Sequence, residues 1–297
     1  MTSPLVTIVI LHWRGAAKTL HCLERVQQLD YAPYHVILVD NGALPAEMAQ
    51  ICAAYPAAEV LVMGHNRGFA AGVNPAIQRA LALGSQYILL LNDDTIVPPD
   101  LLTRLVLVQQ QHPEIGIITP KLQREDTGRL AGLGCFVKPC SIESVGWDTP
   151  DIPQQDGLLL FDAIFGTAMF IEHTVFEAVG LFDERFFFYY EDIDFCLRAR
   201  EQGYLSACDP AVTVQHAVAA SSQRVPGLRQ FYMGRGRQIF FRKYCRGWRR
   251  PGFLLREVGR VGREVRYQLQ QQAPARALAY VGGVLVGLVV PLSLRQP

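Results

Sequence analysis

Short apolar runs alternate with amphipathic segments along most of the chain. The apolar runs are continuous, at residues 6–11, 35–39, 60–63, 87–91 and 115–119. Stretches with helical periodicity separate them, at residues 16–28, 46–55, 73–82 and 100–111. Strands that are apolar on both faces and spaced by helices are typical of a parallel sheet covered on both sides. The pattern therefore predicts an α/β fold with a mostly parallel central sheet flanked by helices.

The regular pattern stops between residues 121 and 161. Glycine, proline and polar residues dominate there, with isolated aromatics such as Trp147, which predicts a mobile substrate loop. Order resumes at residues 163–171, and a helix is expected from Glu191 to about Gln202. A further short strand is expected to end at His216.

The composition is that of a folded, globular protein. The chain has 297 residues, 50% of them hydrophobic and 19% charged, so it can bury a large core and disorder is not expected. Its 7 cysteines are scattered without a Cys-x-x-Cys pair, which predicts reduced thiols in a cytosolic protein, not a disulfide framework or zinc ribbon. The first apolar run lacks a basic flank and is too short for a signal segment, so it is interpreted as a strand.

Charge divides the chain into an acidic body and a basic tail. Residues 1–228 carry 14 Lys and Arg against 25 Asp and Glu, whereas residues 229–297 carry 14 against 2. We therefore expect a main domain over 1–228 and a basic, helical C-terminal region over 229–297. Because the tail also contains many Phe, Leu and Val residues, an anionic surface is its expected partner, either nucleic acid or lipid.

The end of the tail raises the question of a membrane span. Residues 277–294 contain no charge, but 18 positions lie at the lower edge for crossing a bilayer. Gly282, Gly283, Gly287 and Pro291 weaken such a helix, which favours an interfacial or packed helix over a span.

Acidic residues stand directly behind two of the predicted strands. Asn92-Asp93-Asp94-Thr95 follows one apolar run and Asp40-Asn41-Gly42 follows another. The carboxyl ends of strands in open α/β sheets are where ligands bind, so these carboxylates suit a metal, a diphosphate or a base. Ordinary turns have the same composition, and that alternative stays open for both. No Gly-x-Gly-x-x-Gly follows the first strand and no P-loop sequence occurs, which argues against dinucleotide and P-loop binding.

Two further groups of residues are ambiguous when taken alone. Glu191-Asp192-Ile193-Asp194 opens a predicted helix, where acids are favoured by the helix dipole without any catalytic role. His216 at a strand end is either a structural histidine or a metal ligand.

Together the motifs resemble the family 2 glycosyltransferases, and within them the bacterial rhamnosyltransferase-like branch. The resemblance runs over about residues 4–245. It is carried by six ordered segments: residues 6–15, 39–42, 66–70, 92–95, 180–184 and 191–194. It implies a GT-A fold, a nucleotide-diphosphate sugar donor, a Mg²⁺ or Mn²⁺ cofactor and inversion at the anomeric carbon.

The resemblance also implies roles for individual residues. Asp192 is the expected catalytic base, and Asp94 with His216 the expected metal ligands. Gly166, Glu191 and Asp194 are expected on the acceptor side. The expected nucleotide and donor contacts are Trp13, Asp40, Asn41, Asn66, Arg67, Gly68, Asn92 and Asp93.

The predicted function is transfer of a sugar, with L-rhamnose from dTDP-rhamnose as first choice, to a glycan or lipid-linked acceptor at the cytoplasmic face of the membrane. Other donors, such as a UDP-hexose or UDP-N-acetylhexosamine, and a non-catalytic nucleotide-sugar-binding protein remain alternatives. A processive synthase is disfavoured because no Gln-x-x-Arg-Trp occurs. With this function the tail is expected to meet lipid and not nucleic acid.

Overall fold

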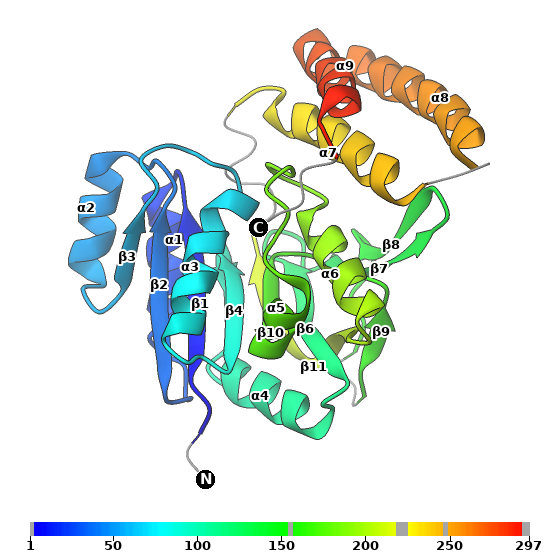
Figure 1. The fold of residues 1–297 in the computed structure, drawn as a ribbon. Helices are drawn as coiled ribbons and strands as arrows, with labels where there is room; N and C mark the ends of the chain where they lie inside the picture. The colour runs from blue at the N-terminus through cyan, green and yellow to red at the C-terminus, as the bar shows by residue number, and fades with distance from the viewer. Residues whose placement is uncertain (1–2, 154–156, 218–224, 246–248, 293–297) are drawn as a thin grey trace.

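A computed structural model describes residues 3–153, 157–217, 225–245 and 249–292. Within these ranges eleven strands form one sheet with helices on both faces, and three further helices follow at the C-terminus (Figure 1). The strands are β1 Val6–His12, β2 Tyr34–Asp40, β3 Glu59–Val62, β4 Tyr87–Asn92, β5 Thr95–Ile96, β6 Ile115–Arg124, β7 Leu130–Lys138, β8 Ser141–Trp147, β9 Leu159–Phe161, β10 Ala168–Glu172 and β11 Leu205–His216. The helices are α1 Ala16–Val26, α2 Pro45–Ala54, α3 Ala70–Ala82, α4 Leu101–Gln111, α5 His173–Val179, α6 Glu191–Glu201, α7 Leu228–Tyr244, α8 Arg249–Gln270 and α9 Pro274–Val289.

The predicted α/β architecture is confirmed, and the sheet is mixed. Its main order is β3-β2-β1-β4-β10-β6-β11-β5. Strands β3, β2, β1 and β4 are parallel, but β10 runs antiparallel to both β4 and β6. The apolar pattern could not reveal this, since a strand buried on both faces is continuously apolar in either direction.

The sheet separates two hydrophobic cores. Ile8 and Ile10 of β1 belong to the core that includes side chains of α1, α2 and α4. Val9, between them, belongs to the core beneath α3, α5, α6 and α7. This alternation explains why every residue from Val6 to Ile10 must be buried, and why the strand contains no polar face.

The region predicted as a mobile loop, residues 121–161, is mainly strand in its described parts, 121–153 and 157–161. β6 continues to Arg124, β7 and β8 form an antiparallel hairpin, and β9 pairs with β11. The glycines that suggested a loop have another cause. A Cβ on Gly132 would lie 2.6 Å from the Phe165 ring, and one on Gly134 would lie 2.4 Å from the Phe161 ring. The glycines therefore admit aromatic rings over the hairpin, which is an established use of glycine within strands.

The C-terminal region is helical, as expected. Ile239, Phe240 and Phe241 of α7 are fully buried in the second core, so α7 packs on the body of the protein. The predicted boundary at residue 228 coincides with the start of α7, and the division into two domains stays a prediction.

Glycines in α9 serve helix packing. A Cβ on Gly283 would lie 1.9 Å from the Phe231 carbonyl oxygen, and one on Gly287 would lie 2.5 Å from the Arg235 carbonyl oxygen. The two helix backbones can approach closely only because these side chains are absent. No helix in the described ranges is long and apolar enough to cross a membrane; residues 293–294 of the uncharged stretch lie outside those ranges.

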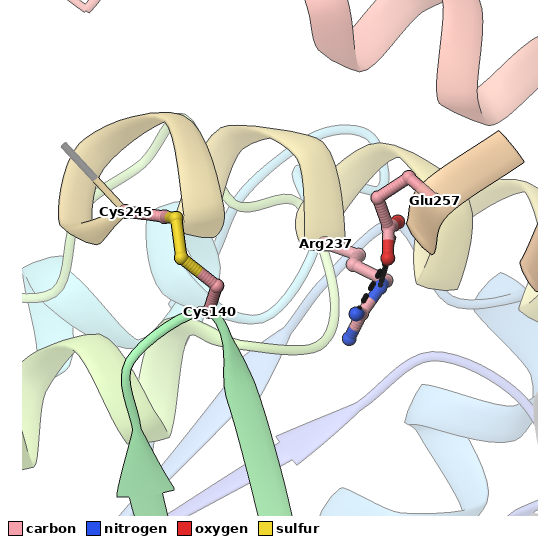
Figure 2. The surroundings of a disulfide bond; sticks show 4 residues. All are labelled: Cys140, Arg237, Cys245 and Glu257. Carbon is pink, nitrogen blue, oxygen red and sulfur yellow. Dashed lines mark hydrogen bonds and ion pairs between the residues drawn. A yellow bond between two sulfur atoms is a disulfide. The ribbon is translucent and has the colours of Figure 1, made fainter. Parts of the chain in front are cut away.

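The prediction that the cysteines are all reduced is wrong for one pair. Cys140, at the turn between β7 and β8, forms a disulfide with Cys245 at the end of α7 (Figure 2). The pair is 105 residues apart, with a Cα–Cα distance of 5.1 Å. The fold brings the hairpin and the end of α7 together, and sequence spacing alone could not predict this pair because it does not give disulfide connectivity.

Asp194 ties α6 to α7. Its carboxylate is completely buried, and it accepts hydrogen bonds from Lys243 Nζ at 2.6 Å and Tyr244 Oη at 2.9 Å. Arg198, one turn along α6, donates to the other carboxylate oxygen at 3.0 Å. The expected acceptor-side role of Asp194 is therefore wrong: the side chain faces α7, and its charge is balanced there.

We predict that Asp194→Ala destabilises the protein by about 3–5 kcal/mol, since removing one partner leaves buried cations without compensation. Urea unfolding followed by circular dichroism measures the change. Asp126→Ala, which removes an exposed ion pair with Arg124, is the control and should leave the unfolding midpoint unchanged. Equal midpoints for Asp194→Ala and wild type would contradict the anchoring role.

Candidate active site

A cavity of about 560 Å³ opens between the strand ends, the start of α6 and the start of α7. It brings together most of the residues proposed from the sequence. They are Trp13, Asn41, Asn66, Gly68, Asn92, Asp93, Asp94, Gly166, Glu191, Asp192 and His216. Three of the proposed residues, Asp40, Arg67 and Asp194, are not part of its lining.

Asp94 and His216 meet because β5 pairs with the end of β11. Thr95 lies opposite His216 in this antiparallel pair, which places the imidazole beside the preceding carboxylate. His216 Nε2 lies 3.1 Å from Asp94 Oδ1. Burial alone would raise the pKa of Asp94, but the hydrogen bond and charge of His216 hold that pKa below its usual value. The structure thus brings the two residues together, and their role as metal ligands stays a prediction.

Asp93 points back into the protein. Its Oδ2 accepts from Thr19 Oγ1 at 2.9 Å and lies 3.0 Å from His12 Nδ1, and the His12 ring is fully buried. Burial raises the pKa of Asp93 despite these partners. His12 and Thr19 were not proposed as site residues, but their contacts with Asp93 hold the acidic turn in place at the C-terminal end of β4.

Asn41 organises the loop that follows β3. Its Nδ2 donates to Asn66 Oδ1 and to the Gly68 carbonyl, both at 3.1 Å, and its Oδ1 accepts from the Arg67 N–H at 2.9 Å. The side chain is 1% exposed, so it shapes the donor side of the cavity from behind. The Arg67 side chain is exposed and outside the cavity.

Asp40 and Gly68 have structural explanations that differ from those expected. Asp40 Oδ1 accepts from the Ala43 N–H at 2.8 Å, which is the turn alternative for Asp-Asn-Gly. Gly68 has φ of +82°, and a Cβ there would lie 2.2 Å from the Phe187 carbonyl oxygen. The backbone that approaches Gly68 is thus Phe187, whose carbonyl also accepts from the Phe69 N–H at 2.7 Å.

Asp192 lies in the first turn of α6, and backbone hydrogen bonds orient both of its carboxylate oxygens. Oδ2 accepts from the Gly166 N–H at 2.9 Å, and Oδ1 accepts from the Ile193 N–H at 2.8 Å. Burial raises the pKa of Asp192, and the two backbone donors offset part of that shift. Burial and the charge of Asp192 raise the pKa of the neighbouring Glu191 well above its ordinary value.

The segment before α6 holds an unusual backbone conformation. Tyr189 and Tyr190 have φ of 71° and 77°, a region that side chains with a Cβ rarely adopt. Phe187 stacks on Tyr232 of α7 at a ring distance of 4.3 Å, and Gly236 leaves room for the Tyr189 carbonyl. Contacts from α7 thus maintain the strained turn that delivers Glu191 and Asp192 to the cavity.

Parts of the cavity wall come from the β7–β8 hairpin and from the C-terminal helices. Trp147 and Ser144 of the hairpin line the cavity, as do Arg229 and Tyr232 of α7 and Arg260 of α8. The aromatic Trp147 had marked the region for a substrate contact, but nothing in the sequence indicated that the basic tail folds over the site.

Asp94 and His216 could hold a divalent cation together with phosphate oxygens of a bound nucleotide. Among the described residues no three His, Cys, Asp or Glu side chains form a metal cluster. Asp94 and His216 are side by side, however, with side chains only 9% and 12% exposed. Mg²⁺ is commonly bound by one or two protein groups together with phosphate oxygens and water, and imidazole is acceptable to Mn²⁺. This donor set matches the cofactor predicted from the sequence.

Known sequences with similarity to the chain include several glycan-building enzymes. It is 26% identical over 199 residues to the low-salt glycan biosynthesis hexosyltransferase Agl10 of Haloferax volcanii, covering 66% of this chain and 62% of that one. It is 24% identical over 253 residues to the N-acetylglucosaminyl-diphospho-decaprenol L-rhamnosyltransferase of Mycobacterium tuberculosis, covering 73% and 77%. It is 23% identical over 247 residues to the dTDP-rhamnosyl transferase RfbF of Shigella flexneri, covering 79% of each.

Solved structures share the fold at lower identity. The mannosyltransferase PcManGT from Pyrobaculum calidifontis, in complex with GDP-Man and Mn²⁺, matches with a TM-score of 0.59 at 14% identity, covering 97% of this chain and 88% of that one. GalNAc-T7 with UDP, GalNAc and Mn²⁺ matches with a TM-score of 0.59 at 15% identity, covering 91% and 58%. These neighbours confirm the GT-A fold. The family model "Glycosyl transferase family 2" matches residues 7–171, and the chain belongs to that family.

Proposed function

We propose that this glycosyltransferase moves L-rhamnose from dTDP-L-rhamnose, with inversion, to a hydroxyl group of a lipid-linked glycan acceptor. One observation carries the reaction type: the oriented carboxylate of Asp192 and the Asp94–His216 pair line the same cavity. The choice of sugar and acceptor draws on relatives named as rhamnosyltransferases, one of which acts on a diphospho-decaprenol acceptor.

In this proposal Asp192 is the general base. Inverting transfer needs a base that takes the proton of the attacking hydroxyl on the face opposite the leaving diphosphate. The Gly166 and Ile193 N–H groups fix the orientation of the carboxylate, and burial raises its pKa, which makes it a stronger base than an exposed aspartate. Glu191, buried beside it, is the second acceptor-side group.

The donor occupies the other end of the cavity. Trp13 offers a ring for stacking on the base, and Asn66 and Asn92 offer amide groups for the ribose and the sugar. Asp94 and His216 would hold Mg²⁺ or Mn²⁺, which supplies Lewis-acid neutralisation of the departing diphosphate when bound.

We expect Asp192→Asn to lower kcat by about 100- to 10,000-fold, the usual contribution of a general base. Donor binding should persist, because Asn keeps the shape of the side chain. Transfer is measured with radiolabelled dTDP-L-rhamnose, and donor binding by thermal shift in the presence of Mn²⁺, with UDP-sugars as comparison. Full transfer by Asp192→Asn would exclude this mechanism, whereas donor binding without transfer by wild type would favour a sugar-nucleotide sensor.

The metal role of Asp94 makes a separate prediction. Asp94→Asn should weaken Mn²⁺ binding in the presence of dTDP by at least about tenfold, since even indirect partners of metal ligands have effects of that size. Electron paramagnetic resonance of free Mn²⁺ measures the affinity without turnover. Asp93→Asn is the matched control, because Asp93 faces His12 and Thr19 instead. A larger loss in Asp93→Asn than in Asp94→Asn would reverse the assignment.

We also propose that α8 and α9 rest on an anionic membrane at its cytoplasmic face. Leu255 and Val258 are 77% and 72% exposed on α8, and Val289 is 76% exposed on α9. On α8 the spacing places Arg256, Arg263 and Arg266 on a stripe beside the exposed apolar one, a pattern typical of interfacial helices. Other basic and aromatic residues of the tail, including Arg246 and Trp248, lie outside the described residues.

Replacing Arg263 and Arg266 together by Ala should reduce binding to anionic vesicles by about 1 kcal/mol per arginine, because each lost cation weakens attraction to the lipid surface. Cosedimentation at low and high salt measures the effect. Arg79→Ala, on α3 in the body of the protein, should behave as wild type. Equal binding of wild type to neutral and anionic vesicles would contradict an electrostatic contribution.

A further inference from the structure

A second cavity of about 410 Å³ lies among the C-terminal helices, next to the active site. Apart from Tyr190, its described lining comes from α7, α8, α9 and the α8–α9 turn. Five lining residues are shared with the active-site cavity: Tyr190, Arg229, Met233, Arg237 and Arg260. The two spaces are therefore neighbours on either side of the turn that precedes Asp192.

The lining of this second cavity is strongly basic. Four arginines contribute to it, namely Arg229, Arg237, Arg260 and Arg276, and Glu264 is the only acid among the described residues that line it. Arg237 is engaged by Glu257 at 2.7 Å, and Arg260 lies 3.8 Å from the same carboxylate. The second cavity thus contains more positive charge than its own acids balance.

Helix stability does not explain the position of two of these arginines. Arg229 lies in the first turn of α7 and Arg276 in the first turn of α9. A cation at the N-terminal end of a helix is unfavourable to the helix dipole, while an anion near that end is favoured. Side chains from the first turns of both helices line the cavity, so the arginines and the nearby helix dipoles favour the same kind of ligand.

A buried amide in the same cavity also lacks a partner. Gln268 is 4% exposed, and its Nε2 donates to Glu264 Oε1 at 2.9 Å. Its Oε1 has no hydrogen-bond partner within the described part of the chain. A buried polar atom without a partner is costly, and a hydroxyl group of a bound ligand would satisfy it.

We propose that this cavity binds the diphosphate of the glycosyl acceptor. The inference rests on the proposed function, in which the reactive hydroxyl lies at Asp192. From there the acceptor continues past Tyr190, with its phosphates among Arg229, Arg260 and Arg276 and its lipid toward the apolar faces of α8 and α9. Guanidinium groups suit phosphate oxygens because they donate two parallel hydrogen bonds.

Arg276→Ala tests this assignment with little risk to folding, since the change removes a cation that the start of α9 does not favour. The probe is N-acetylglucosamine linked through a diphosphate to a short prenyl chain. Titration calorimetry measures its binding to protein already saturated with dTDP and Mg²⁺, so that the donor site is filled. The same sugar on a neutral alkyl chain serves as the comparison ligand.

We expect Arg276→Ala to lower the affinity for the diphosphate probe about tenfold, as for loss of one charged hydrogen-bonding group. The affinity for the neutral probe should not change. Arg276→Lys should recover part of the affinity. Arg79→Ala, on α3 and outside both cavities, should bind the probe as wild type does. Equal affinity of wild type and Arg276→Ala for the diphosphate probe would overturn the assignment.

Three further outcomes distinguish failure of this inference from failure of the proposed function. If Arg276→Ala no longer binds anionic vesicles but still binds the probe as wild type does, the cavity binds a phospholipid headgroup and the assignment fails. If wild type transfers sugar to the probe and Arg276→Ala does so with unchanged KM, the function holds and the assignment fails. If binding of the probe depends on Arg276 but no donor supports sugar transfer to it, the assignment of the cavity holds and the proposed function is refuted.

Discussion

The buried carboxylate of Asp194 is the constraint on which the acceptor side of the molecule depends. A charge removed from water must be balanced nearby, and Lys243, Tyr244 and Arg198 do this at 2.6–3.0 Å. Two of these partners belong to α7. Because Asp194 and Asp192 share one turn of α6, fixing the first against α7 also fixes the second toward Gly166. The C-terminal region is thereby part of the active-site framework.

This dependence explains why the segment before α6 can hold two tyrosines in a left-handed conformation. Such residues persist only where the surroundings leave no alternative. Here the Phe187–Tyr232 stack, the close approach at Gly236 and the Cys140–Cys245 bond join α7 to the body at three separate places. Loss of α7 would release the turn as well as the charge, so folding of the tail and assembly of the site are coupled.

Sequence reasoning succeeded where the signal was local. Continuous apolar runs gave the core strands, and the polar residues at their ends gave Asp94 and most of the donor side of the cavity. The family motif at the start of a predicted helix gave Asp192. The family motif named Asp94 and His216 together, which local patterns cannot do, and the two side chains do lie side by side. It failed where the deciding contact joins distant segments. Gly132 and Gly134 resembled loop residues until aromatic rings were found above them. Asp194 and Asp192 are indistinguishable by composition, and only the position of α7 assigns them different roles. Cys140 and Cys245 are paired by tertiary packing alone.

The distribution of charge then suggests how an acceptor is oriented. Asp94, whose pKa is held below its usual value, and Asp192 make the inner part of the active-site cavity acidic. Arg229, Arg237 and Arg260 lie where the two cavities meet, and Arg276 adds to the positive charge of the neighbouring one. A molecule with a neutral hydroxyl at one end and a phosphate group at the other is attracted in only one orientation, with the hydroxyl toward Asp192. The donor diphosphate is repelled by the same acids unless a cation accompanies it. In the proposed function, this distribution of charge distinguishes the two phosphate-bearing substrates, because the donor would bring a cation with it and the acceptor would meet the arginines.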